Sequence, residues 1–503
     1  MLPARLRIAL TSALYLAALA CLRSRIPDGL CNDTAEEALR GVHLIEEKRF
    51  EVITGVIGNS AETLYLYLLG GVVKLLGSST LAIQVTSWGF ALATVWLLVG
   101  LLRRLDPRLP SWLPFLGAAS SIWLFHYARS GLRAISAPVF ALGFCLLLHV
   151  VEKNRKSWSW AVICGGVLGL GVYAYTACRV LPIAFLAYCA VRLAFTRESR
   201  SFLLRSYGLI LLGALVASIP NCLFLLHGPE EFVSRGDYVL RGAWADRLVN
   251  LLWCFLLPFH YPDMYRDLQG PGYFFDGVAA SLTCVGVSPI HPLIACAFLL
   301  GFVPAWRLRR EPGMLFLFLT ALTGTLVLGI AGPSLTRLLI VLPFYLAVAV
   351  LGFGAILHRL PRFGPVVPVA LTLVVLTHGW AYFVQLPKSE VSSGYLAPRA
   401  TAIGERAQQL AIQGKRVLCV VSRDANVVRY LTHDVRASVA VIEFFARPVS
   451  LQEIPIQTFR PQVGLIERNP HFDPVAAALR RALGGRAHDR FEEVLCSRMY
   501  SEP

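Results

Sequence analysis

Long apolar runs separated by short polar clusters dominate the first three quarters of the chain. A helix needs about 20 predominantly apolar residues to cross a bilayer. By that criterion the pattern predicts eleven membrane-spanning helices, at approximately 8–25, 80–102, 111–127, 132–151, 158–175, 179–195, 206–226, 285–305, 313–331, 334–354 and 364–385. We therefore expect a mainly α transmembrane domain over residues 1–385, because backbone polar groups in hydrocarbon must be satisfied within their own segment.

Basic residues gather between alternate apolar runs, as at Arg103–Arg104, Lys153–Lys156 and Arg307–Arg310. Cytoplasmic loops carry such clusters, so the N-terminus is predicted to be cytoplasmic and the chain beyond residue 386 external. This topology requires that Glu62–Gly77 does not cross the membrane. With two glycines and Lys74, this stretch suits an interfacial helix.

The pattern changes after residue 386, where short apolar strands such as RVLCVV and VGLIER alternate with short helical segments. Such alternation predicts a small soluble α/β domain over residues 386–503. The segment contains neither a glycine-rich phosphate loop nor a nucleophile elbow, so we assign it no chemistry.

Composition supports a membrane protein, since 56% of residues are hydrophobic and 16% are charged, against about 25% charged in soluble domains. The net charge of +16 does not indicate nucleic-acid binding, because much of the excess lies in the clusters between helices. The twelve cysteines show no metal-ligand spacing. No metal site is assigned, although separated carboxylates could bind Mg²⁺ or Mn²⁺ through oxygen ligands.

The first external loop contains an amphipathic segment in which Ala35, Ala38 and Val42 recur at helical spacing. Asp33 stands at its start. One interpretation is that Asp33 caps the helix and forms a capping box with Glu36. The other is that a carboxylate at the bilayer surface acts as a general base.

Arginines stand at the external ends of several predicted spans, against the usual charge bias. They are Arg129, Arg133, Arg179 and Arg337, with Tyr173 and Tyr175 close to Arg179 in the sequence and Arg235 in a long external loop. Arginines can snorkel to the interface, and tyrosines are common there. A bound anion explains the position of these arginines better than snorkelling does, because guanidinium groups form bidentate contacts with phosphate oxygens. We expect these side chains to converge on one anion-binding cleft.

Six motifs follow one another in a recognisable order: Asp33-Thr34-Ala35, Glu62-Thr63-Leu64-Tyr65, Ala128-Arg129 with Arg133, Tyr173-Ala174-Tyr175 with Arg179-Val180-Leu181-Pro182, Pro229-Glu230-Glu231-Phe232-Val233-Ser234-Arg235, and Pro333-Ser334-Leu335-Thr336-Arg337. From the N-terminus to about residue 385, the sequence resembles the bacterial integral-membrane (C-type) glycosyltransferases. Its closest resemblance is to the glycosyltransferase family 39-like group, with the protein O-mannosyltransferases and the lipid A aminoarabinose transferase. Thr34 and Thr63 replace a glutamate and a proline of the family pattern.

The resemblance implies an inverting hexosyl- or pentosyltransferase in the bacterial inner membrane. It would move a sugar from a polyprenyl-phosphate donor to an external glycolipid, glycan or protein. Asp33 would be the catalytic base, supported by Glu36, Glu37 and Glu62. The residues implied to hold the donor phosphate are Arg129, Arg133, Tyr173, Tyr175, Arg179, Arg235 and Arg337. A non-catalytic partner in envelope assembly and a lipid or sugar transporter are the alternatives.

Overall fold

The structure is a computed structural model in which the chain forms two compact units. The first contains Met1–Cys21, Phe50–Tyr65 and Ser87–Lys388, and the second contains Leu22–Arg49, Leu66–Thr86 and Ser389–Pro503. The residues described are 4–21, 29–48, 50–54, 61–154, 158–195, 200–227, 244–259, 288–330, 334–385, 397–421, 424–443, 463–467 and 491–494.

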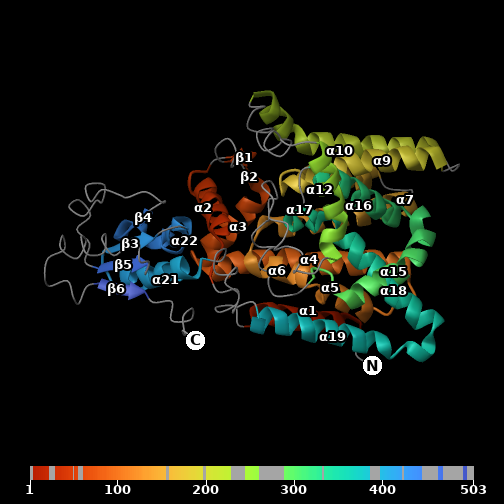
Figure 1. The fold of residues 1–503 in the computed structure, drawn as a ribbon. Coiled ribbons are helices and arrows are strands. Elements are labelled where there is room, and N and C mark those ends of the chain that lie inside the picture. Colours follow the sequence, from red (N-terminus) through yellow and green to blue (C-terminus); the bar gives the residue numbers. More distant parts are fainter. Residues whose placement is uncertain are drawn as a thin grey trace. The chain divides into compact units, whose positions relative to one another are not determined.

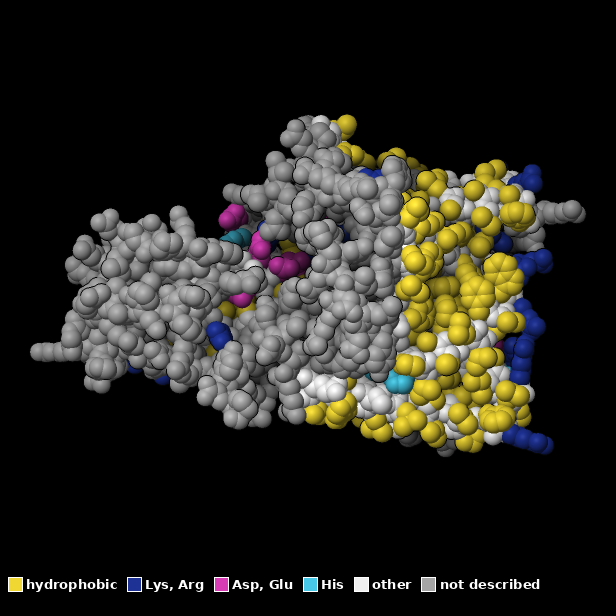
Figure 2. Space-filling view, viewed as in Figure 1, with side chains coloured by type: hydrophobic (Ala, Val, Ile, Leu, Met, Phe, Trp, Pro, Cys, Tyr) yellow, Lys and Arg dark blue, Asp and Glu magenta, His cyan; other side chains and the backbone are white. Residues whose placement is uncertain are grey.

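The first unit is built from helices, the longest of which run alongside one another (Figure 1). They are α1 (Ala4–Ala20), α4 (Thr80–Leu105), α5 (Trp112–Ala119), α6 (Ile122–Ser130), α7 (Ala137–Asn154), α8 (Trp158–Gly171), α9 (Val180–Phe195), α10 (Arg200–His227), α12 (Trp244–Leu256), α15 (Pro292–Arg307), α16 (Pro312–Ile330), α17 (Leu335–Leu338), α18 (Leu342–Arg359) and α19 (Val366–Trp380). Hydrophobic side chains cover much of the face of this unit that Figure 2 shows. Leu211, Leu212 and Leu215 of α10 are exposed. Such a surface suits contact with lipid.

Eight helical stretches in the described ranges are long and apolar enough to cross a membrane. They match the expected spans that begin at 80, 132, 179, 206, 285, 313, 334 and 364. The expected spans 8–25 and 158–175 contain shorter apolar helices, Ala9–Ala20 and Trp158–Gly171. The stretch 111–127 differs, because two helices, α5 and α6, meet at Ser120 and Ser121. Ser121 Oγ accepts the Leu124 N–H at 3.2 Å and so caps α6.

Close helix packing in the first unit depends on glycine, as is common in membrane proteins. Helices α15 and α18 cross where Gly301 and Gly352 lie against each other's helix backbone. A Cβ atom on Gly301 would lie 1.8 Å from the Val348 carbonyl oxygen, and one on Gly352 would lie 1.9 Å from that of Ala297. Only residues without a side chain allow this approach.

The second unit contains a parallel sheet of strand order β4-β3-β5-β6. The strands are β3 (Val417–Val421), β4 (Val439–Glu443), β5 (Val463–Glu467) and β6 (Phe491–Val494), accompanied by helices α21 (Pro398–Ile412) and α22 (Ala425–Leu431). Because β3 comes first in the chain but lies inside the sheet, the connections lead to both sides of it, as in doubly wound α/β folds.

The same unit also contains α2 (Asn32–Glu46) and, from Leu66 onward, α3 (Thr63–Leu76). The two helices touch at Gly41 and Gly70, where an added Cβ on either glycine would come within 2.3 Å of a carbonyl oxygen of the other helix. Helix α2 begins at Asn32, with Cys31 in extended conformation as its N-cap. The interpretation of Asp33 as the cap is therefore wrong, because the helix starts before it.

Candidate functional site

A buried ion cluster in the first unit joins three segments that are distant in the sequence. Glu62 ends strand β2 (Ala61–Glu62), Arg133 begins the 3₁₀ turn η1 (Arg133–Ser136), and Arg179 ends the 3₁₀ turn η2 (Thr176–Arg179). Glu62 Oε2 lies 3.3 Å from Arg133 Nη1, and Glu62 Oε1 lies 3.1 Å from Arg179 Nη2. The side chains of Glu62 and Arg133 are 5% and 7% exposed, whereas that of Arg179 is 29% exposed.

Local backbone contacts hold Glu62 in this place. Strand β2 pairs with β1 (Ile53–Thr54), and Glu62 stands opposite Ile53. The next residue, Thr63, donates its hydroxyl to the Glu51 carbonyl oxygen at 2.6 Å. The Leu64 N–H donates to the Tyr173 carbonyl oxygen at 2.9 Å. The start of α3 is thereby attached to the segment that carries Arg179.

Electrostatics keep the Glu62 carboxylate ionised. Burial raises the pKa of Glu62 and is the largest single influence on it, but Arg133 and Arg179, with a hydrogen bond from Thr176, outweigh it and lower the pKa. Two guanidinium groups share the one Glu62 carboxylate. Since Arg179 is the most exposed of the three side chains, the cluster can be approached from its side.

Tyr175 and Thr176 belong to the cluster, whereas Tyr173 is anchored elsewhere. The Arg133 guanidinium lies 5.8 Å from the centre of the Tyr175 ring, a cation–π distance. Thr176 donates its hydroxyl to Glu62 Oε1. Tyr173 donates its hydroxyl to the Ala217 carbonyl oxygen of α10 at 3.0 Å. Sequence reasoning missed Thr176, although it lies between Tyr175 and Arg179.

Arg129 is buried and contacts the end of α1. Its Nη1 donates to the carbonyl oxygens of Leu19 at 2.7 Å and Cys21 at 2.6 Å. Its guanidinium lies 5.4–5.7 Å from three ring centres, those of Phe125, Tyr382 and Phe383. These contacts satisfy carbonyl groups that a helix end leaves without intrahelical partners. Arg129 therefore holds the C-terminus of α1.

The other expected site residues occupy different places. Arg337 lies on α17, which contacts η2, the turn that carries Arg179. Arg235 lies outside the described residues. Asp33, Glu36 and Glu37 lie on α2 in the second unit, where Asp33 is exposed and Glu36 pairs with Arg40 one turn later. Within the described ranges, no three His, Cys, Asp or Glu side chains gather as metal ligands would.

Comparisons with known proteins identify the fold. No protein-family model matches the chain, and no curated protein sequence matches it. Its structure is similar to that of ArnT from Cupriavidus metallidurans bound to undecaprenyl phosphate, with a TM-score of 0.56 and 12% identity over 87% of this chain and 86% of that one. Apo ArnT from the same organism gives a TM-score of 0.52 and 12% identity over 85% of each chain.

The oligosaccharyltransferase of Archaeoglobus fulgidus in its apo form is also similar. Its TM-score is 0.51 at 12% identity, and the match covers 87% of this chain and 64% of that one. The chain thus has the fold of the integral-membrane C-type glycosyltransferases, as the motifs predicted. The prediction of a mainly helical, polytopic membrane protein is confirmed.

Proposed function

We propose that this protein is a membrane glycosyltransferase that moves a sugar from a polyprenyl-phosphate donor to an extracytoplasmic acceptor. The observation that carries the proposal is the cluster of Glu62, Arg133 and Arg179, in which two guanidinium groups are held together by one carboxylate. Guanidinium donors suit the oxygens of a lipid phosphate. The shared fold supports it, since one similar structure is ArnT bound to undecaprenyl phosphate.

The guanidinium groups of the cluster match the chemistry of such a donor. A polyprenyl-phosphate sugar is a phosphodiester with one negative charge, which guanidinium groups can bind. When the sugar leaves, the phosphate becomes a monoester of about −1.5 to −2 charge at pH 7. Guanidinium donors on Arg133 and Arg179 would stabilise this developing charge, which is how preorganised dipoles and charges lower a barrier. Arg235 and Arg337 are further candidates for donor contacts.

Asp33 is the proposed base for the acceptor. Its carboxylate would accept the proton of the acceptor hydroxyl, whose oxygen attacks the anomeric carbon while the bond from that carbon to the phosphate oxygen breaks. The electron pair of that bond stays on the phosphate, and the anomeric centre inverts. Glu36 and Glu37 would contribute negative charge near the start of α2, whereas Glu62 holds the two arginines.

The test is transfer by an Asp33→Asn variant, assayed in detergent with a labelled polyprenyl-phosphate sugar. We expect a loss of at least about a hundredfold, typical for removal of a general base. Glu47→Gln, at the other end of α2, is the matched control and should retain activity. Undiminished transfer by the Asp33 variant would remove Asp33 from the mechanism.

The same preparations separate the two alternatives. Binding of polyprenyl phosphate by the wild-type protein without turnover would indicate a non-catalytic partner in envelope assembly. Accumulation of sugar inside vesicles without a covalent product would indicate a transporter. Mass spectrometry of the lipid that purifies with the protein would identify the donor directly.

A further inference from the structure

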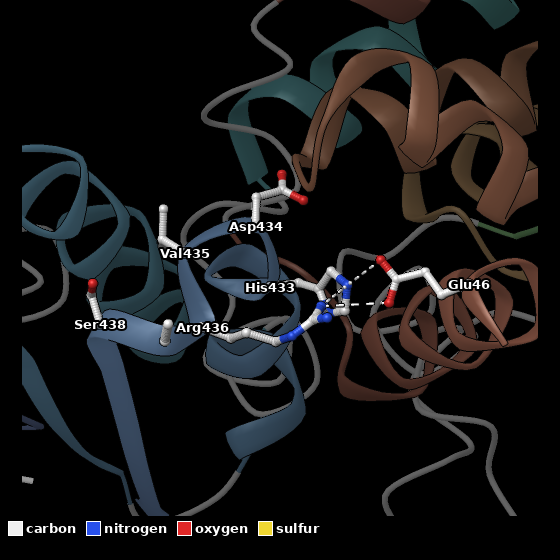
Figure 3. A pocket seen from close by; sticks show the side chains of 7 residues that line it. Glu46, His433, Asp434, Val435, Arg436 and Ser438 are labelled. Atoms are coloured by element: carbon white, nitrogen blue, oxygen red, sulfur yellow. Dashed lines mark hydrogen bonds and ion pairs between the residues drawn. The ribbon is translucent and has the colours of Figure 1, made fainter.

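The C-terminal part of the second unit contacts helix α2 through the 3₁₀ turn η9 (His433–Ser438). His433 Nε2 lies 3.4 Å from Glu46 Oε1, and Arg436 Nη1 lies 3.5 Å from Glu46 Oε2. Figure 3 shows both side chains directed at the Glu46 carboxylate. Lys74 of α3 contacts the same carboxylate at 2.8 Å. The last turn of α2 is therefore fixed from both α3 and the C-terminal domain.

A second set of contacts reaches the turn that follows α3. Asp434 Oδ2 accepts the Ser78 N–H at 2.8 Å. The Tyr430 hydroxyl donates to the Ser79 carbonyl oxygen at 2.9 Å. Tyr430 is fully buried and belongs to α22, which also packs against α2. The contacts on Glu46 are thus reinforced by hydrogen bonds to the backbone of the α3–α4 connection.

A third contact lies just before α2 begins. The Leu30 N–H donates to Thr401 Oγ1 of α21 at 2.9 Å. Leu30 is 3% exposed and Thr401 is 9% exposed, so water competes little for this bond. Helix α2 is therefore attached to the C-terminal domain at both of its ends.

We propose that the C-terminal α/β domain is a positioning module that fixes α2 and with it the first helical turn, where Asp33 lies. Isolated helices below about 12–15 residues are marginal in water, and α2, with 15 residues, is close to that limit. Tertiary contacts, including those at its two ends, therefore contribute much of its stability. The inference rests on the proposed function only where it concerns catalysis, since it assumes that Asp33 is the base.

Positioning matters because a displacement of about 1 Å in a catalytic group can lower a rate about a hundredfold. If the C-terminal domain fixes α2, weakening its contacts will slow the chemical step without weakening the binding of the lipid donor, whose proposed arginines lie in the first unit. The chemical class of the acceptor does not enter this argument.

The test uses full-length protein in lipid nanodiscs and hydrogen exchange of the amides of α2. Thr401→Val removes the acceptor of the Leu30 N–H with little change of shape. Asp434→Ala removes the acceptor of the Ser78 N–H, and Asp434→Asn retains one. We expect exchange in α2 to rise about tenfold in Thr401→Val and Asp434→Ala, as for the loss of one buried hydrogen bond. In Asp434→Asn it should stay near the wild-type rate.

The control is Lys415→Gln, because Lys415 is exposed and lies between α21 and β3. Transfer assays should show a lower kcat and an unchanged KM for the lipid donor in Thr401→Val and Asp434→Ala, with recovery in Asp434→Asn. A variant that only destabilised the fold would have a lower melting temperature and lower activity, but it would not show a selective decrease of kcat.

Two results would overturn the inference. One is unchanged exchange in α2 in both disruptive variants. The other is faster exchange with an unchanged kcat, which would show that the attachment of α2 does not serve catalysis. If the wild-type protein transfers no sugar at all, the proposed function fails, and the exchange data alone then decide whether the C-terminal domain fixes α2.

Discussion

At the scale of single residues, Glu62 determines the charge of the proposed phosphate site. Replacing Glu62 by Gln would remove one negative charge from the cluster, while the amide oxygen could still accept from Thr176. Unit charges 4 Å apart interact by about 4 kcal/mol near a protein surface, so we expect at least about tenfold tighter binding of polyprenyl phosphate. Turnover should fall, because the doubly charged product leaves more slowly.

The measurement is the rise in melting temperature on addition of polyprenyl phosphate. The Glu62→Gln variant should be less stable alone, since breaking a buried ion pair costs about 3–5 kcal/mol, and should gain more from the lipid than the wild type. Glu311→Gln, which breaks the partly exposed pair with Lys153, is the control and should respond like the wild type. If polyprenyl phosphate raised the melting temperature of the Glu62→Gln variant and of the wild type equally, the phosphate would bind elsewhere.

We expect His433 to make the attachment of α2 depend on pH. Burial lowers the pKa of His433 below its usual 6.5, Arg436 and His43 act in the same direction, and Glu46 opposes them. Lys74, followed by His433, lowers the pKa of Glu46 to about 2 against the effect of burial, so that carboxylate stays charged in this range. Because the folded state binds the His433 proton less readily than the unfolded state, its stabilising contribution is present above pH 6.5 and declines below it.

We therefore expect the last turn of α2 to exchange its amides faster at about pH 5.5 than at about pH 7.5, after correction for intrinsic exchange. In a His433→Gln variant this difference should shrink. If exchange in the wild type and in His433→Gln depended on pH to the same extent, groups other than His433 would be responsible.

The sequence identified several residues of the ion cluster but not their connections. Arg133, Tyr175 and Arg179 lie close together, because they stand at the ends of neighbouring helices. Arg129 also stands at the external end of an expected span, but its guanidinium donates to carbonyl oxygens at the end of α1. An arginine at a helix end can bind a phosphate or a carbonyl group, and charge and hydropathy along the chain do not distinguish them.

At the scale of elements, the crossing of α15 and α18 has no room for a side chain. Gly352→Ala would bring a methyl group against the Ala297 carbonyl oxygen, so the helices must move apart. We expect a loss of about 1–3 kcal/mol of stability, typical of overpacking, seen as a lower melting temperature. Gly208→Ala in α10 is the control, because nothing lies within 4 Å of the added Cβ. If the Gly352→Ala variant were as stable as the wild type, α15 and α18 would pack less closely than the structure shows.

Element lengths were largely readable from the sequence, but interruptions were not. Eight expected spans correspond to long apolar helices, because hydropathy over a bilayer's thickness is a strong signal. The break between α5 and α6 lies inside an apolar run, where average hydropathy stays high. The pair Ser120 and Ser121 was the available signal, since serine hydroxyls cap helices.

At the scale of the whole molecule, the division into two units follows contacts and not sequence order. Residues 22–49 and 66–86 belong with the C-terminal domain, although hundreds of residues separate them. The sequence predicted a small α/β segment after residue 386, but it held no sign that α2 packs against α22 of that segment. Contacts such as that of Leu30 with Thr401 are long-range and leave no periodic pattern.

The orientation of the chain in the membrane gives a last prediction. Lys and Arg side chains gather at one end of the helices of the first unit in Figure 2. Arg103 and Arg359 lie in the last turns of α4 and α18. Positively charged loops stay in the cytoplasm, so the chain after α19 should emerge outside. Alkaline phosphatase, which is active only outside the cytoplasm, should be active when fused after Pro503 and inactive when fused after Asp106. The reverse pattern would mean that the protein has the opposite orientation in the membrane, and the Glu62 cluster would then face a cytoplasmic donor.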